Sequence, residues 1–210
     1  MAEVLGTKVT TPKAMLSYPH IAEAVQQKND DGTAKGKPKY SAALVFEAGA
    51  DLRPLQKAVL AAGEAKWPGK LQAMIEDSKK SVAAGGRIKF NLPFRMDGEE
   101  KGYAAGSTFI NVRTEQKPGC VYSYADPTSA KPAIIPPDKI VEALYPGCFV
   151  RATIVAFGYD REGNRGISFA LNNIQKLGDG ERLDNRKAAV DEFDVDLSAA
   201  PADLDSLLGA

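Results

Sequence analysis

From Phe149 to Tyr159 the sequence reads Phe-Val-Arg-Ala-Thr-Ile-Val-Ala-Phe-Gly-Tyr, the strongest β-strand pattern in this 210-residue chain. Apolar, β-branched and aromatic residues dominate it, as expected of a strand that is largely buried. The polar, glycine-containing stretch Asp160–Gly166 predicts a hairpin loop, and Ile167–Gln175 predicts the returning strand. The fold should therefore close with a long antiparallel hairpin.

Upstream of this hairpin the chain alternates between strand patterns and one helical segment. Strands are expected at Lys13–Ile21 (interrupted at Pro19), Lys39–Phe46, Arg87–Leu92, Ser107–Val112 and Cys120–Tyr124. A polar loop is expected over Gln26–Pro38. Helical spacing after Asp51, a candidate N-cap, predicts one helix to Lys66 and a second from Leu71 toward Gly85, and Asp138 is a candidate cap for a short helix through Ala143.

This pattern predicts a mainly β domain over residues 1–187, with a helical insertion at about 51–85. A small, partly open β-barrel of the OB type fits best, and a β-sandwich with a helical insertion is the alternative that pattern alone leaves open. The composition, 44% hydrophobic and 26% charged, is that of an ordinary globular protein. No apolar run reaches the ~20 residues of a membrane-spanning helix, and the N-terminus lacks the pattern of a secretory signal, so the cytoplasm is the expected location.

Charge is divided unevenly along the chain. The last cation is Lys187, so residues 1–187 hold 27 basic and 21 acidic residues, a net charge of +6, whereas residues 188–210 carry −6. A basic body with an acidic tail is typical of proteins that bind polyanions. The tail mixes acidic and apolar residues, which predicts a disordered segment that contacts partners or screens the basic surface; its candidate contact residues are Asp191, Glu192, Phe193, Asp194, Asp196, Asp203 and Asp205.

Signals of catalysis are weak. The single histidine, His20, lies beside Pro19 and is expected in a surface or turn position, and the sequence holds neither a GxSxG elbow nor a phosphate-binding P-loop. Cys120 and Cys148 are isolated and are expected to be buried thiols rather than zinc ligands. The acidic turn Asp97–Glu100 leaves a metal-dependent nuclease as a minor alternative. No catalytic residue, cofactor or metal site is predicted.

Cations interleaved with aromatic residues favour single-stranded nucleic acid as the ligand, since each nucleotide offers a phosphate and a base face. Phe90, Phe109, Phe149 and Phe169 are expected in the core, because strands of a barrel need apolar filling. Tyrosines can stack while the hydroxyl stays in water, so the stacking candidates are Tyr18, Tyr40, Tyr103, Tyr122, Tyr124 and Tyr159. The candidate phosphate contacts are Lys39, Arg95, Lys101, Arg113, Arg151 and Arg165.

Four stretches of the chain resemble a family of bacteriophage single-stranded DNA-binding proteins with an OB fold and an acidic C-terminus. They are Leu16–Pro19, Pro38–Ala42, Pro93–Lys101 and the block from Tyr145 through Val150-Arg-Ala to Leu171-Asn-Asn-Ile-Gln-Lys176. The resemblance implies a protein that coats ssDNA without marked sequence preference in phage replication, recombination and repair, inside the bacterial host. It also implies a tail that recruits replication proteins.

One feature departs from the usual OB-fold pattern. The main helices follow the second strand, whereas the usual OB order places a helix between strands three and four. A phage structural or assembly module that self-associates without binding DNA is the alternative function, and a homo-oligomer is compatible with either reading.

Overall fold

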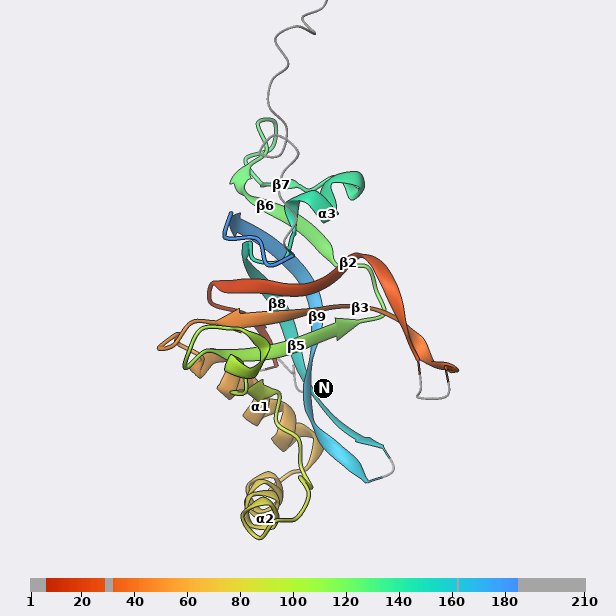
Figure 1. Ribbon diagram of the computed structural model, residues 1–210, viewed down its shortest axis with the longest axis vertical. Coiled ribbons are helices and arrows are strands. Elements are labelled where there is room, and N and C mark those ends of the chain that lie inside the picture. Colours follow the sequence, from red (N-terminus) through yellow and green to blue (C-terminus); the bar gives the residue numbers. More distant parts are fainter. Residues whose placement is uncertain (1–6, 29–31, 162, 185–210) are drawn as a thin grey trace, which may run out of the picture.

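The computed structural model describes residues 7–28, 32–161 and 163–184 (Figure 1). Its strands are β1 (Lys8–Thr10), β2 (Ala14–Lys28), β3 (Ala34–Phe46), β4 (Phe94–Arg95), β5 (Thr108–Thr114), β6 (Gly119–Ala125), β7 (Pro132–Ile134), β8 (Phe149–Arg161) and β9 (Asn164–Gly178). Its helices are α1 (Arg53–Lys66), α2 (Leu71–Ala83) and α3 (Ile140–Ala143), with 3₁₀ turns η1 (Glu99–Lys101) and η2 (Pro137–Lys139). No helix in this described part of the chain is long and apolar enough to cross a membrane.

Five of the strands close into a barrel. They pair in the order β8-β2-β3-β5-β9, and β9 pairs again with β8, which completes the ring. Within the ring only β5 and β9 run parallel. This Greek-key closure is that of an OB barrel, so the predicted mainly β fold with a helical insertion is confirmed and the β-sandwich is excluded. Helices α1 and α2 follow the second strand of the ring, as the sequence indicated.

The barrel core is built from every second residue of each strand, because successive side chains of a strand point to opposite faces. Leu16, Leu44, Ile110, Ile154 and Phe169 are all fully buried in it. Helix α1 adds its own buried apolar stripe and packs against β8. Three of the four phenylalanines expected in the core are buried; Phe149 is half-buried, with the Lys13 Nζ 3.9 Å from its ring centroid.

The prediction of a strand over Arg87–Leu92 is wrong. Of this segment only Asn91 forms a β-bridge, to Gly166. The buried hydroxyl of Ser78 on α2 accepts the backbone N–H groups of Lys89 and Phe90, both at 3.0 Å. These N–H groups are therefore satisfied by the helix, and the segment becomes a loop tied to α2.

The first predicted strand is longer than expected, and the polar loop after it is shorter. Strand β2 continues through Pro19 to Lys28, and β3 already begins at Ala34. The pairing shifts register after Ser17, and Tyr18 adopts a φ of 45°. This irregularity accommodates the missing N–H of Pro19 within a continuing strand.

Two predicted caps also differ. Helix α1 begins at Arg53 with Leu52 at the N-cap, although the Asp51 carboxylate still accepts the Arg53 N–H at 3.1 Å. Asp138 lies within η2 and does not cap α3. The predicted acidic tail, residues 188–210, lies outside the described residues.

Candidate nucleic-acid interface

The candidate interface is built on the outer face of β3 and β5, called the open face below. Ser41 pairs with Arg113 and Ala43 with Asn111, so these four residues share the face that points away from the core. The face borders a shallow cavity of about 250 Å³. Its lining mixes polar, cationic and apolar side chains with the exposed rings of a tyrosine and a histidine: Tyr18, His20, Val25, Gln27, Lys39, Ser41, Ala42, Ala43, Asn111 and Arg113.

The charges on this face are available to an anion. Within the described residues Arg113 is exposed and makes no ion pair or hydrogen bond. Lys39 lies 3.7 Å from a carboxylate oxygen of Glu115, an ion pair between exposed side chains. Such pairs contribute little to stability, so a phosphate can replace the carboxylate at small cost.

The same face continues across β9 to the β8–β9 hairpin. Arg113 lies opposite Ala170 on β9, and Ala170 lies opposite Val155 on β8. Further along β8, Phe157 and Tyr159 have the same orientation as Val155, because they are two and four residues away. Phe157 is 43% exposed and Tyr159 is half-buried. Two aromatic rings therefore extend the cationic face along the hairpin.

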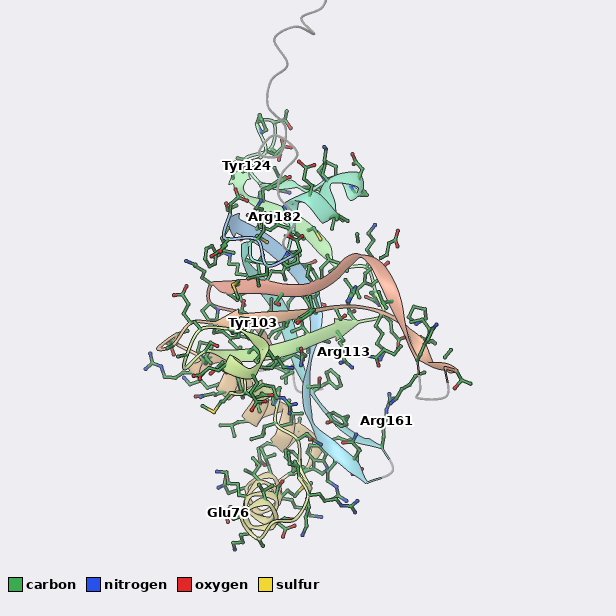
Figure 2. All side chains as sticks on the ribbon, viewed as in Figure 1. Glu76, Tyr103, Arg113, Tyr124, Arg161 and Arg182 are labelled. Atoms are coloured by element: carbon green, nitrogen blue, oxygen red, sulfur yellow. The ribbon has the colours of Figure 1, made fainter. Side chains whose placement is uncertain are left out.

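Two hairpins frame this surface. The β2–β3 and β8–β9 hairpins both extend beyond the barrel, on the same side in Figure 1. Figure 2 shows Arg113 beside β5 and Arg161 at the far end of the β8–β9 hairpin, directed toward the β2–β3 hairpin in this view. In OB folds the outer face of the second and third strands, together with the first and last hairpin loops, is where oligonucleotides bind. These elements are β3, β5 and the two hairpins here.

Tyr103, one of the predicted stacking residues, is placed in the core rather than on the surface. It is 8% exposed, packs edge-on against Phe109 at 5.6 Å, and donates its hydroxyl to Ser17 Oγ at 3.0 Å. Burial raises the pKa of its phenol. The residue belongs to a small cluster in which the loop after β4 covers the outer side of Ala43 and Val45. Its ring has no face free for a base.

Lys101 and Arg95 lie at the edge of that covered region. The Lys101 Nζ is 5.9 Å from the ring centroid of Phe109, and Arg95 Nε is 3.9 Å from Asp97 Oδ1. Both cations are exposed. They neighbour the open face without lining its cavity.

Three predicted residues lie at the other end of the barrel. Tyr122 and Tyr124 on β6 stack on each other, with ring centroids 4.7 Å apart and planes 16° apart. Arg151 donates to Gln175 at 2.6 Å, and Gln175 donates to the Tyr122 carbonyl at 3.0 Å. The tyrosines border a separate cavity formed with β7, η2 and α3. They do not join Lys39 and Arg113.

The remaining predicted residues lie close to the interface with different orientations. Tyr40 is half-buried and points to the face of β3 opposite Lys39 and Ser41. Arg165 lies opposite Asp160 on the β8–β9 hairpin, 3.9 Å from its carboxylate. The seven predicted contact residues of the tail lie outside the described part of the chain.

Several residues of the interface were missed from the sequence. These are His20, Ser41 and Asn111, which line the cavity. Phe157 and Arg161, on the framing hairpin, belong to the interleaved cations and aromatic residues of the sequence but were not among the candidate contacts. The strand alternation around Arg113 would have pointed to Asn111, just as alternation from the sequence places Phe157 on the same face as Tyr159. His20 gave no signal, because its place depends on the irregular pairing of β2.

The remaining reactive groups have structural roles. Burial raises the pKa of Cys120 to about 11 and that of Cys148 to about 12, as expected for buried thiols. In the predicted acidic turn, Asp97 contacts Arg95, and Glu99 accepts the Gly106 N–H at 3.2 Å. Among the described residues no group of three or more His, Cys, Asp or Glu side chains is arranged to hold a metal ion.

Comparison with known proteins agrees with this architecture. The ssDNA-binding protein of bacteriophage Enc34, solved in complex with ssDNA, superposes with a TM-score of 0.56 at 20% identity, covering 85% of this chain and 90% of that chain. The ssDNA-binding protein gp2.5 of bacteriophage T7 superposes with a TM-score of 0.50 at 12% identity, covering 86% and 97%. At these identities the likeness is one of fold.

Sequence comparison identifies the family. Protein p50 of Acyrthosiphon pisum secondary endosymbiont phage 1 is 32% identical over 107 residues, which span 50% of this chain and only 52% of that protein. The family profile described as "Enterobacter phage Enc34, ssDNA-binding protein" matches residues 7–205. Because that match covers nearly the whole sequence, the chain belongs to the family of the Enterobacter phage Enc34 ssDNA-binding protein.

Proposed function

We propose that this protein binds single-stranded DNA across the outer face of β3, β5 and β9, between the β2–β3 and β8–β9 hairpins. The observation that carries the proposal is the open face around Arg113, whose cation has no partner among the described residues. Family membership and the barrel topology support it.

Two forces would hold the strand. Lys39, Arg113 and Arg161 neutralise phosphates and release counterions, which makes affinity fall with salt. Tyr18, which is 67% exposed, and Phe157 offer ring faces to bases, each stack contributing about 1–3 kcal/mol. Neither force reads base edges, so binding is largely independent of sequence.

The biological role follows from such binding. The protein coats ssDNA during phage replication, recombination and repair in the cytoplasm of the bacterial host, as a binding protein rather than an enzyme. Residues 188–210, with their charge of −6, either screen the basic face or recruit replication proteins.

The test is a fluorescence-anisotropy titration with a labelled dT strand of about 30 nucleotides, long enough for several OB-fold site sizes. It is run from low to high salt with unlabelled duplex as competitor. Tight, salt-sensitive binding that duplex does not compete supports the proposal. Absence of binding at low salt, with self-association instead, would replace it by the assembly module.

A further inference from the structure

A second concave surface lies between the helical insertion and the β8–β9 hairpin. Its volume is about 590 Å³. The loop after α2 forms one wall and the hairpin end forms another; the lining residues are Met74, Asp77, Arg87, Ile88, Lys89, Phe90, Asn91, Gly163, Asn164 and Arg165. We call this surface the insertion cleft.

The walls of the insertion cleft are held in place by specific contacts. Ser78 fixes Lys89 and Phe90 to α2, and Phe90 packs edge-on against Trp67 at 5.3 Å. Across the cleft Asn91 Nδ2 donates to Asn164 Oδ1 at 3.0 Å, and the Asn91 N–H donates to the Arg165 carbonyl at 2.9 Å. The loop and the hairpin are therefore joined.

Gly166 makes this junction possible. A Cβ added at this position would lie 2.3 Å from the Asn91 carbonyl oxygen, a backbone atom. Any other residue would push the loop away from the hairpin. The close approach thus depends on glycine at residue 166.

The insertion cleft is cationic. Its lining holds Arg87, Lys89 and Arg165 and one carboxylate, Asp77, which lies 3.1 Å from the Lys89 Nζ. Arg165 also lies 3.9 Å from the Asp160 carboxylate, which is outside the lining. The side chain of Arg87 has no ion pair or hydrogen bond within the described residues. The Lys89–Asp77 contact joins exposed groups and is weak enough for a phosphate to replace. The chemistry suits an anionic chain with a polar backbone.

The hairpin connects the insertion cleft to the proposed DNA-binding face. Asp160 and Arg165 lie opposite each other on one face of the hairpin, and Arg161 and Asn164 on the other. Arg161 therefore shares its face with Phe157 and Tyr159, and Arg165, on the opposite face, lines the insertion cleft. A DNA strand that crosses the hairpin meets one arginine on each side of it.

We propose that the insertion cleft binds the phosphodiester backbone of the same DNA strand after it leaves the barrel face. Arg161 on one face of the β8–β9 hairpin, and Arg165, Arg87 and Lys89 in the insertion cleft, would supply the phosphate contacts. The helical insertion thus lengthens the binding site beyond the five-stranded barrel. This inference rests on the proposed ssDNA binding and adds a site to it.

The test compares a short and a long oligonucleotide. A dT strand of about 8 nucleotides is within the range of one OB-fold site, and one of about 20 nucleotides exceeds it. The full-length Arg87→Ala/Lys89→Ala variant should bind the short strand like the wild type. For the long strand its Kd should rise by on the order of tenfold, and the salt slope should fall by about 1.4, since each single-strand phosphate contact contributes about 0.7.

The control is Lys57→Ala/Lys79→Ala, which removes the same charge from exposed positions on α1 and α2 that do not line the cleft. It should leave both Kd values close to wild type. Equal losses in the two double variants, or a wild-type Kd for Arg87→Ala/Lys89→Ala on the long strand, would overturn the insertion cleft as a DNA site. Failure of the wild type to bind either strand would instead reject the proposed function itself. Unchanged thermal unfolding shows that the variants are folded.

Discussion

Arg113 has the position that a phosphate contact requires, an exposed cation in the centre of an open face. Arg113→Ala should lower the salt slope of ssDNA binding by about 0.7 and raise Kd about fivefold at 0.1 M salt, because one counterion fewer is released. Anisotropy titrations at several salt concentrations measure both quantities.

Arg151→Ala is the matched control for this prediction. Arg151 is also exposed, but it donates to Gln175 at the β6–β9 end of the barrel. Its loss should change Kd by less than about twofold. If the two variants weaken binding equally, the DNA strand also contacts the end of the barrel that holds the Tyr122–Tyr124 pair. The proposed DNA-binding face is then too small.

Tyr103 gives the opposite prediction, a change in stability without a change in binding. Tyr103→Phe removes the hydroxyl that bonds to Ser17 in a buried cluster. Loss of such a bond should lower the free energy of unfolding by about 1 kcal/mol. Urea unfolding measures the loss, and the ssDNA Kd should stay at the wild-type value. A weaker Kd with unchanged unfolding would return Tyr103 to the interface.

For single residues, the sequence indicated which chemical types the site needs better than it indicated which of those residues lie on the surface. Tyr18, Lys39 and Arg113 lie together at the cavity of the open face, and their contacts with DNA stay predictions. Tyr103 could not be separated from them, because its burial depends on a loop folding over the outer face of β3. Local composition does not encode such a contact between distant segments.

The end of β9 is secured to the start of β8 by a network of polar contacts. Asp179 lies 2.7 Å from the Lys176 Nζ and accepts the Tyr145 hydroxyl at 3.0 Å, while that hydroxyl accepts the Gly180 N–H at 3.1 Å. The hydrogen bond from Lys176, and then that from Tyr145, lowers the pKa of Asp179 below its ordinary 3.8. The carboxylate therefore stabilises the fold only when ionised.

Asp179→Asn should accordingly lower the melting temperature at neutral pH, by a small amount because the carboxylate is mostly exposed. The wild-type advantage is complete well above pH 3.8 and is lost as the pH falls through the depressed pKa. Thermal unfolding monitored from pH 7 to acid pH tests this. An advantage that persists at a pH where Asp179 is protonated would rule out the ionic explanation.

Helices and strands were predictable from the sequence where one face is apolar and the other polar. The β8–β9 hairpin, β3 and α1 follow from alternation or helical spacing. The outer part of the β2–β3 hairpin was predicted as loop, since its residues are polar on both faces. It is held by pairing and by Gln26, whose side-chain amide donates to the carbonyls of Lys35 and Gly36 at 3.2 and 2.9 Å. Cross-strand contacts of this kind have no signature in the local sequence.

Taken as a whole, the molecule has a net charge of zero but a basic body of +6 and a tail of −6. The positive electrostatic potential of the body attracts both a polyanion and the acidic tail, so the two compete even where they do not contact the same residues. Removing residues 188–210 should lower the ssDNA Kd, by on the order of tenfold at about 50 mM salt. The difference should shrink toward zero at about 1 M salt, where the Debye length falls to about 3 Å.

A variant with a charge-neutral tail distinguishes electrostatic screening of the basic body from specific docking of the tail on the DNA-binding face. In this variant the six tail acids become Asn or Gln, and Phe193 and the leucines remain. If the tail only screens, the neutral-tail protein and the 1–187 truncation should bind ssDNA equally tightly at every salt concentration. If the apolar residues of the tail occupy the DNA-binding face, the neutral-tail protein will bind more weakly than the truncation, and that deficit will persist at high salt because apolar contacts are not screened.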